Sequence, residues 1–212
     1  MPFDRKSADE RRGLLFLVVG PSGVGKDSLI QGARRRLGDD VGYHFPTRLI
    51  TRPEDAQGED HQAVALEAFE RLEAAGGFML SWRAHGQCYG IPKSAEQALA
   101  EGRSVVVNVS RQIIDQARRR WPPVKVLLIS APHEVLRARL AARGREAGSD
   151  INKRLERAHA YRVSGDDVFE VVNADELEGA IDRFVALIES GTRASTHLYR
   201  SGVNEKVGAK PK

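Results

Sequence analysis

The most specific chemical signal in the chain is a glycine-rich segment that ends in a lysine, an aspartate and a serine. It follows the pattern G-x-x-x-x-G-K-[ST], in which glycines let backbone N–H groups converge on phosphate oxygens and the lysine adds a charge near the β and γ phosphates. Asp27 stands where the pattern has a hydroxyl. Such a segment binds a nucleoside triphosphate. The residues expected to hold its phosphates are Gly20, Pro21, Ser22, Gly23, Val24, Gly25, Lys26, Asp27 and Ser28.

Two flanking elements would position this segment. Residues 14–19 form an unbroken apolar run, which is typical of a strand buried on both faces of a parallel sheet. Leu29, Ile30, Ala33 and Leu37 then recur at helical spacing. The segment is therefore expected to join a strand to a helix, whose N-terminus adds a partial positive charge that faces the bound anion.

Strand patterns and helix patterns alternate along the rest of the chain. Apolar runs predict further strands at 105–109, 124–130 and 168–172, and helical spacing predicts helices at 110–121, 133–143, 151–161 and 176–190. This alternation predicts an α/β fold of the P-loop NTPase type, in which a parallel sheet is flanked by helices.

Two stretches interrupt the alternation. Residues 43–92, with a short helix near 66–75, are expected to form an acceptor-binding lobe inserted over the phosphate loop. Residues 143–150 are expected to form a short mobile lid between two helices. The domain would span 13–191, with a disordered lead-in at 1–12 and a flexible tail at 192–212.

The composition excludes several classes of protein. The chain has 212 residues and one cysteine, Cys88, so no intrachain disulfide can form and a reducing compartment is expected. No apolar run could span a membrane, and residues 1–12 lack the apolar core of a secretory signal, so we expect a cytoplasmic protein without a membrane partner. The net charge of +4 would suit a nucleic-acid binder, but 29 acidic residues accompany 33 basic ones and only 6% are aromatic. This aromatic content is low for a protein that stacks on bases, so nucleic acid is not expected as a partner.

Arginines near the predicted lid could stabilise a phosphoryl group during its transfer. Arg139 and Arg143 lie four residues apart, hence on one helical face, and Arg154 follows on the next helix. With Lys26 they are the candidate catalytic residues, although each arginine could also be an ordinary solvated one. In the lobe, Arg52 precedes a proline, which favours an extended backbone and could present its guanidinium to a phosphate.

These motifs together resemble the guanylate kinase superfamily over about residues 13–190. The segments that carry the resemblance are the phosphate loop, Thr51-Arg52-Pro53, Gly58-Glu59-Asp60-His61, Tyr89-Gly90, Arg143-Gly144 and Ile151-Asn152-Lys153-Arg154-Leu155. In detail the chain resembles one branch, the ribose 1,5-bisphosphate phosphokinases of phosphonate catabolism. The features of that branch are Gly25-Lys26-Asp27-Ser28, Leu80-Ser81-Trp82, Ala84-His85-Gly86, Val107-Asn108-Val109-Ser110-Arg111 and Arg143-Gly144-Arg145-Glu146.

The resemblance implies that the γ-phosphoryl group of ATP is moved onto the 1-phosphate of ribose 1,5-bisphosphate, giving 5-phosphoribosyl 1-diphosphate. Guanylate kinases read guanine with a Glu before the lobe's Trp and a Ser or Thr after Tyr-Gly, where this chain has Ser81 and Ile91. A site without those groups should reject guanine, because polar groups left unpaired are costly. The residues implied to bind the sugar bisphosphate are Arg52, Glu59, His61, Ser81, His85, Tyr89 and Asn108.

Alternatives to this reading are a guanylate or other nucleoside monophosphate kinase, and an inactive binding module on the same fold. Intact Lys26 and the lid arginines argue against the binding module. Mg²⁺ is the expected cofactor. It usually binds the loop hydroxyl and a carboxylate at a strand end, but here that strand ends in Asn108, so Asp27 is predicted as the metal ligand. Asn173 is a weaker candidate for contact with the ATP base, and the sequence does not reveal the oligomeric state.

Overall fold

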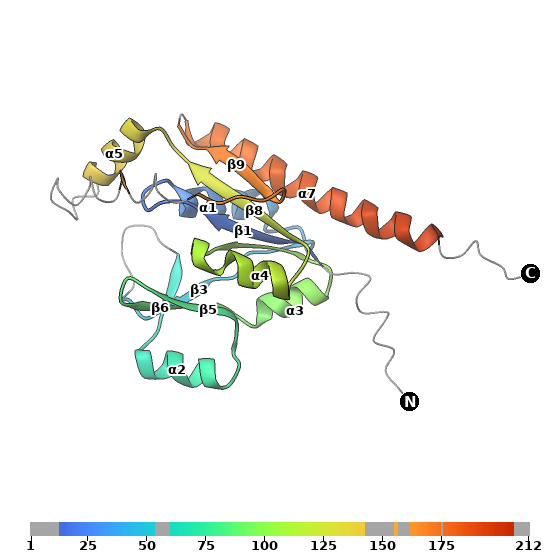
Figure 1. Cartoon of the computed structure of the whole chain (residues 1–212), viewed down its shortest axis with the longest axis horizontal. Coiled ribbons are helices and arrows are strands. Elements are labelled where there is room, and N and C mark those ends of the chain that lie inside the picture. Colours follow the sequence, from blue (N-terminus) through green and yellow to red (C-terminus); the bar gives the residue numbers. More distant parts are fainter. Residues whose placement is uncertain (1–12, 54–59, 143–154, 157–161, 175, 206–212) are drawn as a thin grey trace, which may run out of the picture.

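The fold has two sheets of different size (Figure 1). The computed structural model describes residues 13–53, 60–142, 155–156, 162–174 and 176–205, with the backbone alone for 196–205. A five-stranded, wholly parallel sheet has the order β2-β7-β1-β8-β9, and a four-stranded sheet has the order β4-β3-β6-β5. The strands are β1 (Leu15–Val19), β2 (Tyr43–His44), β3 (Arg48–Ile50), β4 (His61–Ala63), β5 (Phe78–Ala84), β6 (Gln87–Pro92), β7 (Ser104–Asn108), β8 (Val124–Ser130) and β9 (Val168–Val172).

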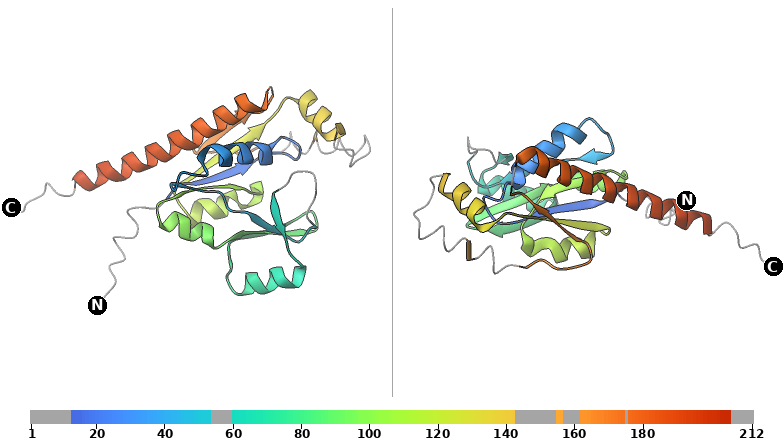
Figure 2. Two further views of the ribbon diagram at one scale, coloured as in Figure 1. Left: turned by 180° about the vertical axis from the view of Figure 1, so that it is seen from behind. Right: turned by 90° about the horizontal axis from the view of Figure 1, so that it is seen from above.

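Helices cover both faces of the five-stranded sheet. One face packs against α1 and α7, and the other against α3 and α4, as Figures 1 and 2 show. The helix α2 lies on the outer side of the small sheet, away from the large one (Figure 1). The helices are α1 (Lys26–Leu37), α2 (Leu66–Ala74), α3 (Ser94–Ala100), the 3-10 helix η2 (Arg111–Ile113), α4 (Ile114–Arg120), α5 (His133–Ala142) and α7 (Leu177–Glu205).

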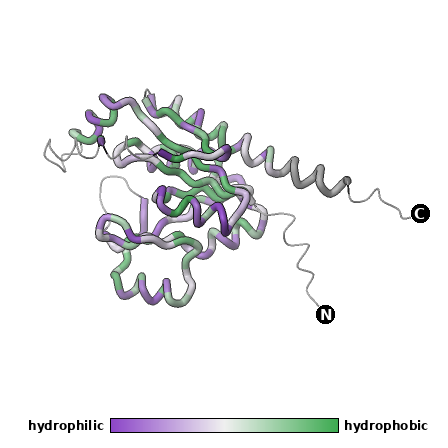
Figure 3. Tube along the Cα trace, in the orientation of Figure 1, coloured by the Kyte–Doolittle hydropathy of each residue, from purple (hydrophilic) through white to green (hydrophobic). Residues whose placement is uncertain are grey.

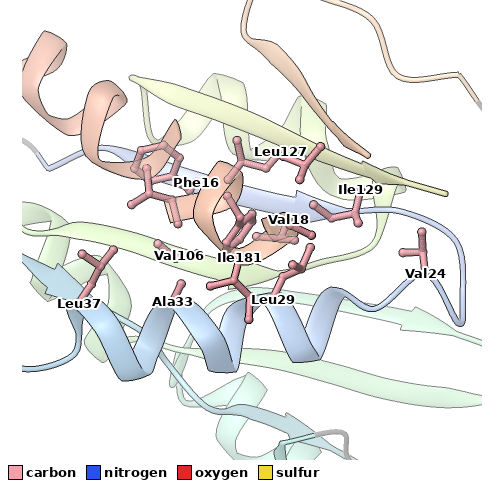
Figure 4. Packing of buried hydrophobic residues seen from close by; sticks show 14 of the residues in the cluster. Phe16, Val18, Val24, Leu29, Ala33, Leu37, Val106, Leu127, Ile129 and Ile181 are labelled. Atoms are coloured by element: carbon pink, nitrogen blue, oxygen red, sulfur yellow. The ribbon is translucent and has the colours of Figure 1, made fainter. Parts of the chain in front are cut away.

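The central strand β1 is buried along its whole length. Because side chains alternate across a strand, Phe16 and Val18 join the core beneath α1 and α7, and Leu15 and Leu17 join the core beneath α3 and α4. Figure 4 shows Phe16 and Val18 on the side of β1 that faces α1, in one core with Leu29 and Ala33. Because both faces of β1 are buried, every residue of the strand is apolar.

The outer helices are apolar on one side only. Figure 3 shows the central strands mostly green and the described helices alternating between green and purple. Where α1 meets α7, the side chain of Ile181 lies against the backbone of α1, since a Cβ on Gly32 would lie 2.4 Å from Cδ1 of Ile181. This close approach fixes the helix that carries the lysine of the phosphate loop.

The α/β fold predicted from the sequence is confirmed, including all four predicted strands of the parallel sheet. The predicted lobe boundary needs correction, because Tyr43 and His44 form β2 and pair with Ser104 and Val105 of β7 in the large sheet. A two-residue strand is too short to show a periodic pattern. The lobe sheet itself comprises β3 to β6.

The predicted flexible tail also needs correction, because α7 continues past residue 192 to Glu205 (Figure 2). Thr192 donates from its hydroxyl to the carbonyl of Ile188 at 2.9 Å, and the same hydroxyl lies 2.9 Å from Oγ of Ser104. A Cβ on Gly191 would lie 2.9 Å from the ring of Phe16, so this turn of the helix is packed on the sheet. The predicted lead-in at 1–12 and lid at 143–150 lie outside the described residues.

In the part of the chain that the structure describes, every helix is too short or too polar to pass through a lipid bilayer.

Replacing Phe184 with alanine is expected to lower the free energy of unfolding by about 3–5 kcal/mol, because the ring is fully buried between α7 and the sheet and its removal leaves a cavity. Urea unfolding followed by circular dichroism measures the change. Leu66→Ala is the control, since Leu66 is 48% exposed and its loss should cost about 0.5 kcal/mol. Equal losses in the two variants would contradict the assigned core.

Candidate functional site

The phosphate loop lies between the end of β1 at Val19 and the start of α1 at Lys26. Gly23 and Gly25 have φ angles of 85° and 95°, in the left-handed region that favours glycine. Side chains are excluded there as well, because a Cβ on Gly25 would lie 2.4 Å from Nδ2 of Asn173. The loop can therefore keep its tight curve only with glycine at these positions.

Lys26 folds back over this loop. Its Nζ donates to the carbonyl oxygen of Gly20 at 2.8 Å and to that of Pro21 at 3.0 Å. These bonds hold the ammonium group at the mouth of the loop, where the helix N-terminus also favours an anion. The charge of the Lys26 ammonium group and the partial charge of the helix N-terminus therefore act at the same place.

The carbonyl of Val24, in the middle of the loop, is held by two side chains. Nδ2 of Asn173 donates to it at 2.8 Å, and Nη1 of Arg139 lies 3.4 Å from it and 3.0 Å from the carbonyl of Asn173. Asn173 is itself fixed at the end of β9 by a backbone bond to Ser130 and is only 1% exposed. The structure thus brings both predicted residues to the loop, where both contact its backbone.

Asp27 connects three separate elements. Its Oδ1 accepts from Nδ2 of Asn108 at 2.9 Å and from Nη2 of Arg48 at 3.3 Å. Asn108 ends β7 and pairs with Val18 of β1, so these residues meet at the carboxyl edge of the parallel sheet. Ligands of open α/β sheets bind at that edge.

Arg48 is the site residue that the sequence did not reveal. It opens β3 and is only 6% exposed, which is unusual for an arginine and indicates a side chain directed into the protein. The strand has three residues, so its alternation is too short to recognise. The one available signal is that Arg48 lies in phase with the buried Ile50.

Four side chains share one face of the lobe sheet with Arg48. Ile50 pairs with Tyr89, Tyr89 pairs with Trp82, and Arg48 pairs with His61, and directly paired residues project from the same face. The rings of Trp82 and Tyr89 stack with centroids 5.2 Å apart. We call Arg48, Ile50, His61, Trp82 and Tyr89 the inner face of the lobe, because Trp82 joins the core under α3 and α4 and Arg48 reaches Asp27.

Arg52 follows β3, and its carbonyl oxygen lies 3.3 Å from Nε2 of His61. The buried His61 therefore fixes the backbone of Arg52 next to the inner face. Of the residues expected to bind the acceptor, Asn108 contacts Asp27, while His61 and Tyr89 lie on the inner face and the backbone of Arg52 adjoins it.

Two other expected acceptor residues lie elsewhere. Ser81 is on the opposite face of the lobe sheet and donates to Oε1 of Glu73 at 2.6 Å, beside two bonds from Arg83 to the same carboxylate. The bonds from Arg83 and Ser81 lower the pKa of Glu73. His85 is exposed and has a φ of 51° in the two-residue turn between β5 and β6. Glu59, Arg143 and Arg154 lie outside the described residues.

A phosphate loop at the carboxyl edge of a parallel sheet, covered by a lobe that faces it, defines a P-loop protein of the nucleotide-dependent kinase class. The family model described as guanylate kinase matches residues 12–191. The chain is 42% identical to the ribose 1,5-bisphosphate phosphokinase PhnN of Rhizobium etli, over 90% of this chain and 96% of that one. It is 44% identical to the same-named protein of Pseudomonas paraeruginosa, over 86% and 98% of the two chains.

The chain belongs to the guanylate kinase family, in the branch of the ribose 1,5-bisphosphate phosphokinases. A guanylate kinase from Anaplasma phagocytophilum shares the fold, with a TM-score of 0.61 at 21% identity over 86% of this chain and 87% of that one. The chain is also 45% identical to the bifunctional ribose 1,5-bisphosphokinase-thymidine phosphorylase of Cupriavidus necator, but spans only 30% of that protein.

Gly25→Ala is expected to weaken ATP binding at least about tenfold. The alanine would have to keep the left-handed backbone of Gly25, which is costly for a residue with a Cβ, and its methyl group would collide with Asn173. Titration with a fluorescent ATP analogue measures the affinity. The control is Gly86→Ala. Gly86 also has a positive φ, of 73°, but it lies in the β5–β6 turn, and a Cβ there would have no atom within 4 Å. Unchanged affinity in Gly25→Ala would show that the loop tolerates a different shape.

Proposed function

We propose that this protein transfers the γ-phosphoryl group of ATP to the 1-phosphate of ribose 1,5-bisphosphate, giving 5-phosphoribosyl 1-diphosphate and ADP. The observation that carries the proposal is the composition of the inner face of the lobe. It carries His61 and Tyr89 beside Arg48, which contacts Asp27 next to the phosphate loop, whereas Ser81, at the position where guanylate kinases carry a guanine-reading Glu, lies on the opposite face. An anionic acceptor without a guanine suits such a face.

The chemistry requires alignment and charge neutralisation more than a base. By analogy with other phosphate monoesters, the acceptor phosphate is largely dianionic at pH 7 and needs no deprotonation to act as a nucleophile. One of its oxygens forms a bond to the γ phosphorus, while the bond from that phosphorus to the bridging oxygen breaks and leaves its electron pair on ADP. The main obstacle is repulsion between two anions, which preorganised cations reduce.

Lys26 is the cation best placed for this task, since its Nζ is held at the mouth of the loop. Arg139 is proposed to assist, and its bonds to Val24 and Asn173 support a second role as a positioning residue for the loop. Arg143 and Arg154 remain proposed catalytic residues on sequence grounds. The contact of Asn173 with the ATP base likewise stays a prediction, because in the structure its amide nitrogen bonds to the loop.

Mg²⁺ would be held by the ATP phosphates and by Asp27, and when bound would neutralise charge on the β and γ phosphates. The residues fit this arrangement. Both hydrogen bonds described for Asp27 end on Oδ1, so Oδ2 is the oxygen left for a metal ion or its water. Among the described residues no group of three or more His, Cys, Asp or Glu side chains gathers as a metal cage, which suits an ion bound by one carboxylate and substrate phosphates.

The acceptor can be identified by measuring ADP formation with ribose 1,5-bisphosphate and with GMP side by side. We expect kcat/KM for the bisphosphate to exceed that for GMP by at least about a hundredfold, because several guanine polar groups would lack partners at roughly 1–3 kcal/mol each. GMP is the second candidate, since guanylate kinases share this fold. A higher kcat/KM with GMP would overturn the proposal and favour that candidate.

The metal assignment can be tested with Asp27→Ser, which restores the hydroxyl of the general loop pattern but removes the carboxylate. The Mg²⁺ concentration needed for half-maximal turnover is expected to rise about tenfold, because the remaining ligands are neutral or belong to ATP. Asp115→Ser is the control, since Asp115 is an exposed α4 residue paired with Arg118. An unchanged Mg²⁺ requirement in Asp27→Ser would exclude Asp27 as a ligand.

A further inference from the structure

One face of α1 is joined to the lobe at two points. Asp27 and Arg34 are seven residues apart, which is about two helical turns, so their side chains leave α1 on the same side and about 10 Å apart along its axis. Asp27 contacts Arg48 of β3. Arg34 contacts Asp60, which directly precedes β4. The helix that begins in the phosphate loop is therefore paired with two neighbouring strands of the lobe.

The two contacts have opposite polarity. At the first point α1 carries the carboxylate and the lobe carries the guanidinium, and at the second point the two charges are exchanged. If the lobe shifted along α1, Arg48 would approach Arg34, and like charges placed together are unfavourable. The arrangement of the charges thus favours one position of the lobe along the helix.

The guanidinium of Arg34 also fastens the segment that leads into the lobe. Its Nη1 donates to Oδ2 of Asp60 at 2.7 Å, and its Nη2 donates to the carbonyl oxygen of Phe45 at 2.9 Å. Phe45 lies between β2 of the large sheet and β3 of the lobe. Surface ion pairs usually contribute little, because two long side chains must be ordered, but here one guanidinium holds two partners and one of them is backbone. A lobe that moves away from α1 together with its connecting segment loses both bonds.

Asp60 stands next to a residue of the inner face. His61 follows it in the chain, pairs with Arg48 and is buried. A displacement of Asp60 is therefore passed to His61 and to the carbonyl of Arg52, which lies against the His61 ring. Misplacement of reacting groups by about 1 Å can cost a large part of the rate of a transfer reaction.

We propose that Arg34 is a positioning residue for the transfer reaction, which sets the inner face of the lobe against the phosphate loop through Asp60 and the carbonyl of Phe45. In this role Arg34 itself touches neither the nucleotide nor the acceptor. The inference rests on the proposed function only in that the lobe binds the phosphate acceptor.

Steady-state kinetics of Arg34→Gln test this role, with ribose 1,5-bisphosphate and GMP each offered as the acceptor. In the variant, kcat/KM for the acceptor that the wild type prefers should fall about three- to tenfold, because a surface ion pair and a charged hydrogen bond are lost. Affinity for a fluorescent ATP analogue without acceptor should change less than about twofold, since the loop is untouched, and this binding also shows that the variant is folded. Unchanged kcat/KM, or an equal loss of ATP affinity, would overturn the inference.

Arg36→Gln is the matched control. Arg36 lies on the same helix and also bridges two partners, but these are Glu178 and Asp182 of α7. Its side chain is 36% exposed and that of Arg34 is 37% exposed. This variant should keep the kcat/KM of the wild type. A loss as large as in Arg34→Gln would contradict a specific role for the contact with the lobe.

Exchange of the two charges separates positioning from a general effect on the fold. Arg34→Asp alone places two carboxylates together and should lower kcat/KM more than Arg34→Gln does. Adding Asp60→Arg restores an attractive pair and should recover at least about threefold of that loss, although the bond to Phe45 stays lost. A double variant without any recovery would overturn the proposal.

The proposed function and this inference fail in different ways. A wild-type protein that prefers GMP to ribose 1,5-bisphosphate overturns the proposed function, and the loss in Arg34→Gln is then measured with GMP. Wild-type kinetics in Arg34→Gln, with whichever acceptor is preferred, overturn only the role of Arg34.

Discussion

The site depends on one hydrogen-bond acceptor, the carbonyl oxygen of Val24. This carbonyl lies in the middle of the phosphate loop, and Asn173 and Arg139 hold it from the end of β9 and from α5. With the carbonyl fixed, the peptide groups around it can turn their N–H groups toward a phosphate, which the left-handed glycines allow. Residues distant in sequence thus set the curvature of a loop whose own side chains are mostly small.

A second constraint joins the loop to the lobe. Asp27 accepts bonds from both Asn108 and Arg48, so one carboxylate connects the helix that follows the loop, a central strand and the first lobe strand. The stacked rings of Trp82 and Tyr89 lie on the same lobe face, and Trp82 packs into the core beneath α3 and α4. Charge and apolar packing therefore act together to place the lobe against the phosphate loop.

The sequence could predict what neighbouring residues determine. The strand β1, the phosphate loop and α1 are continuous in the chain, and each shows its own local pattern. Contacts between distant segments leave no such pattern. Arg48 becomes visible as a site residue only because β3 brings it to Asp27, and Ser81 is excluded from the inner face only by the pairing of β5 with β6. The strand β2 and the turn of α7 at Gly191 and Thr192 escaped prediction for the same reason, since β2 is defined by pairing with β7 and this turn by contacts with Phe16 and Ser104.

The stacked pair on the inner face gives the protein an internal optical probe. The chain has two tryptophans, and they occupy different surroundings: Trp121 is 1% exposed in the core, with Arg120 above its ring, whereas Trp82 lies parallel to Tyr89 beside the residues assigned to the acceptor. Indole emission responds to nearby charge and water, so a ligand on the inner face changes the environment of one tryptophan and leaves the other as an internal reference. Binding of an acceptor at the inner face, as proposed above, could therefore be followed in the unmodified protein, without a label and without turnover.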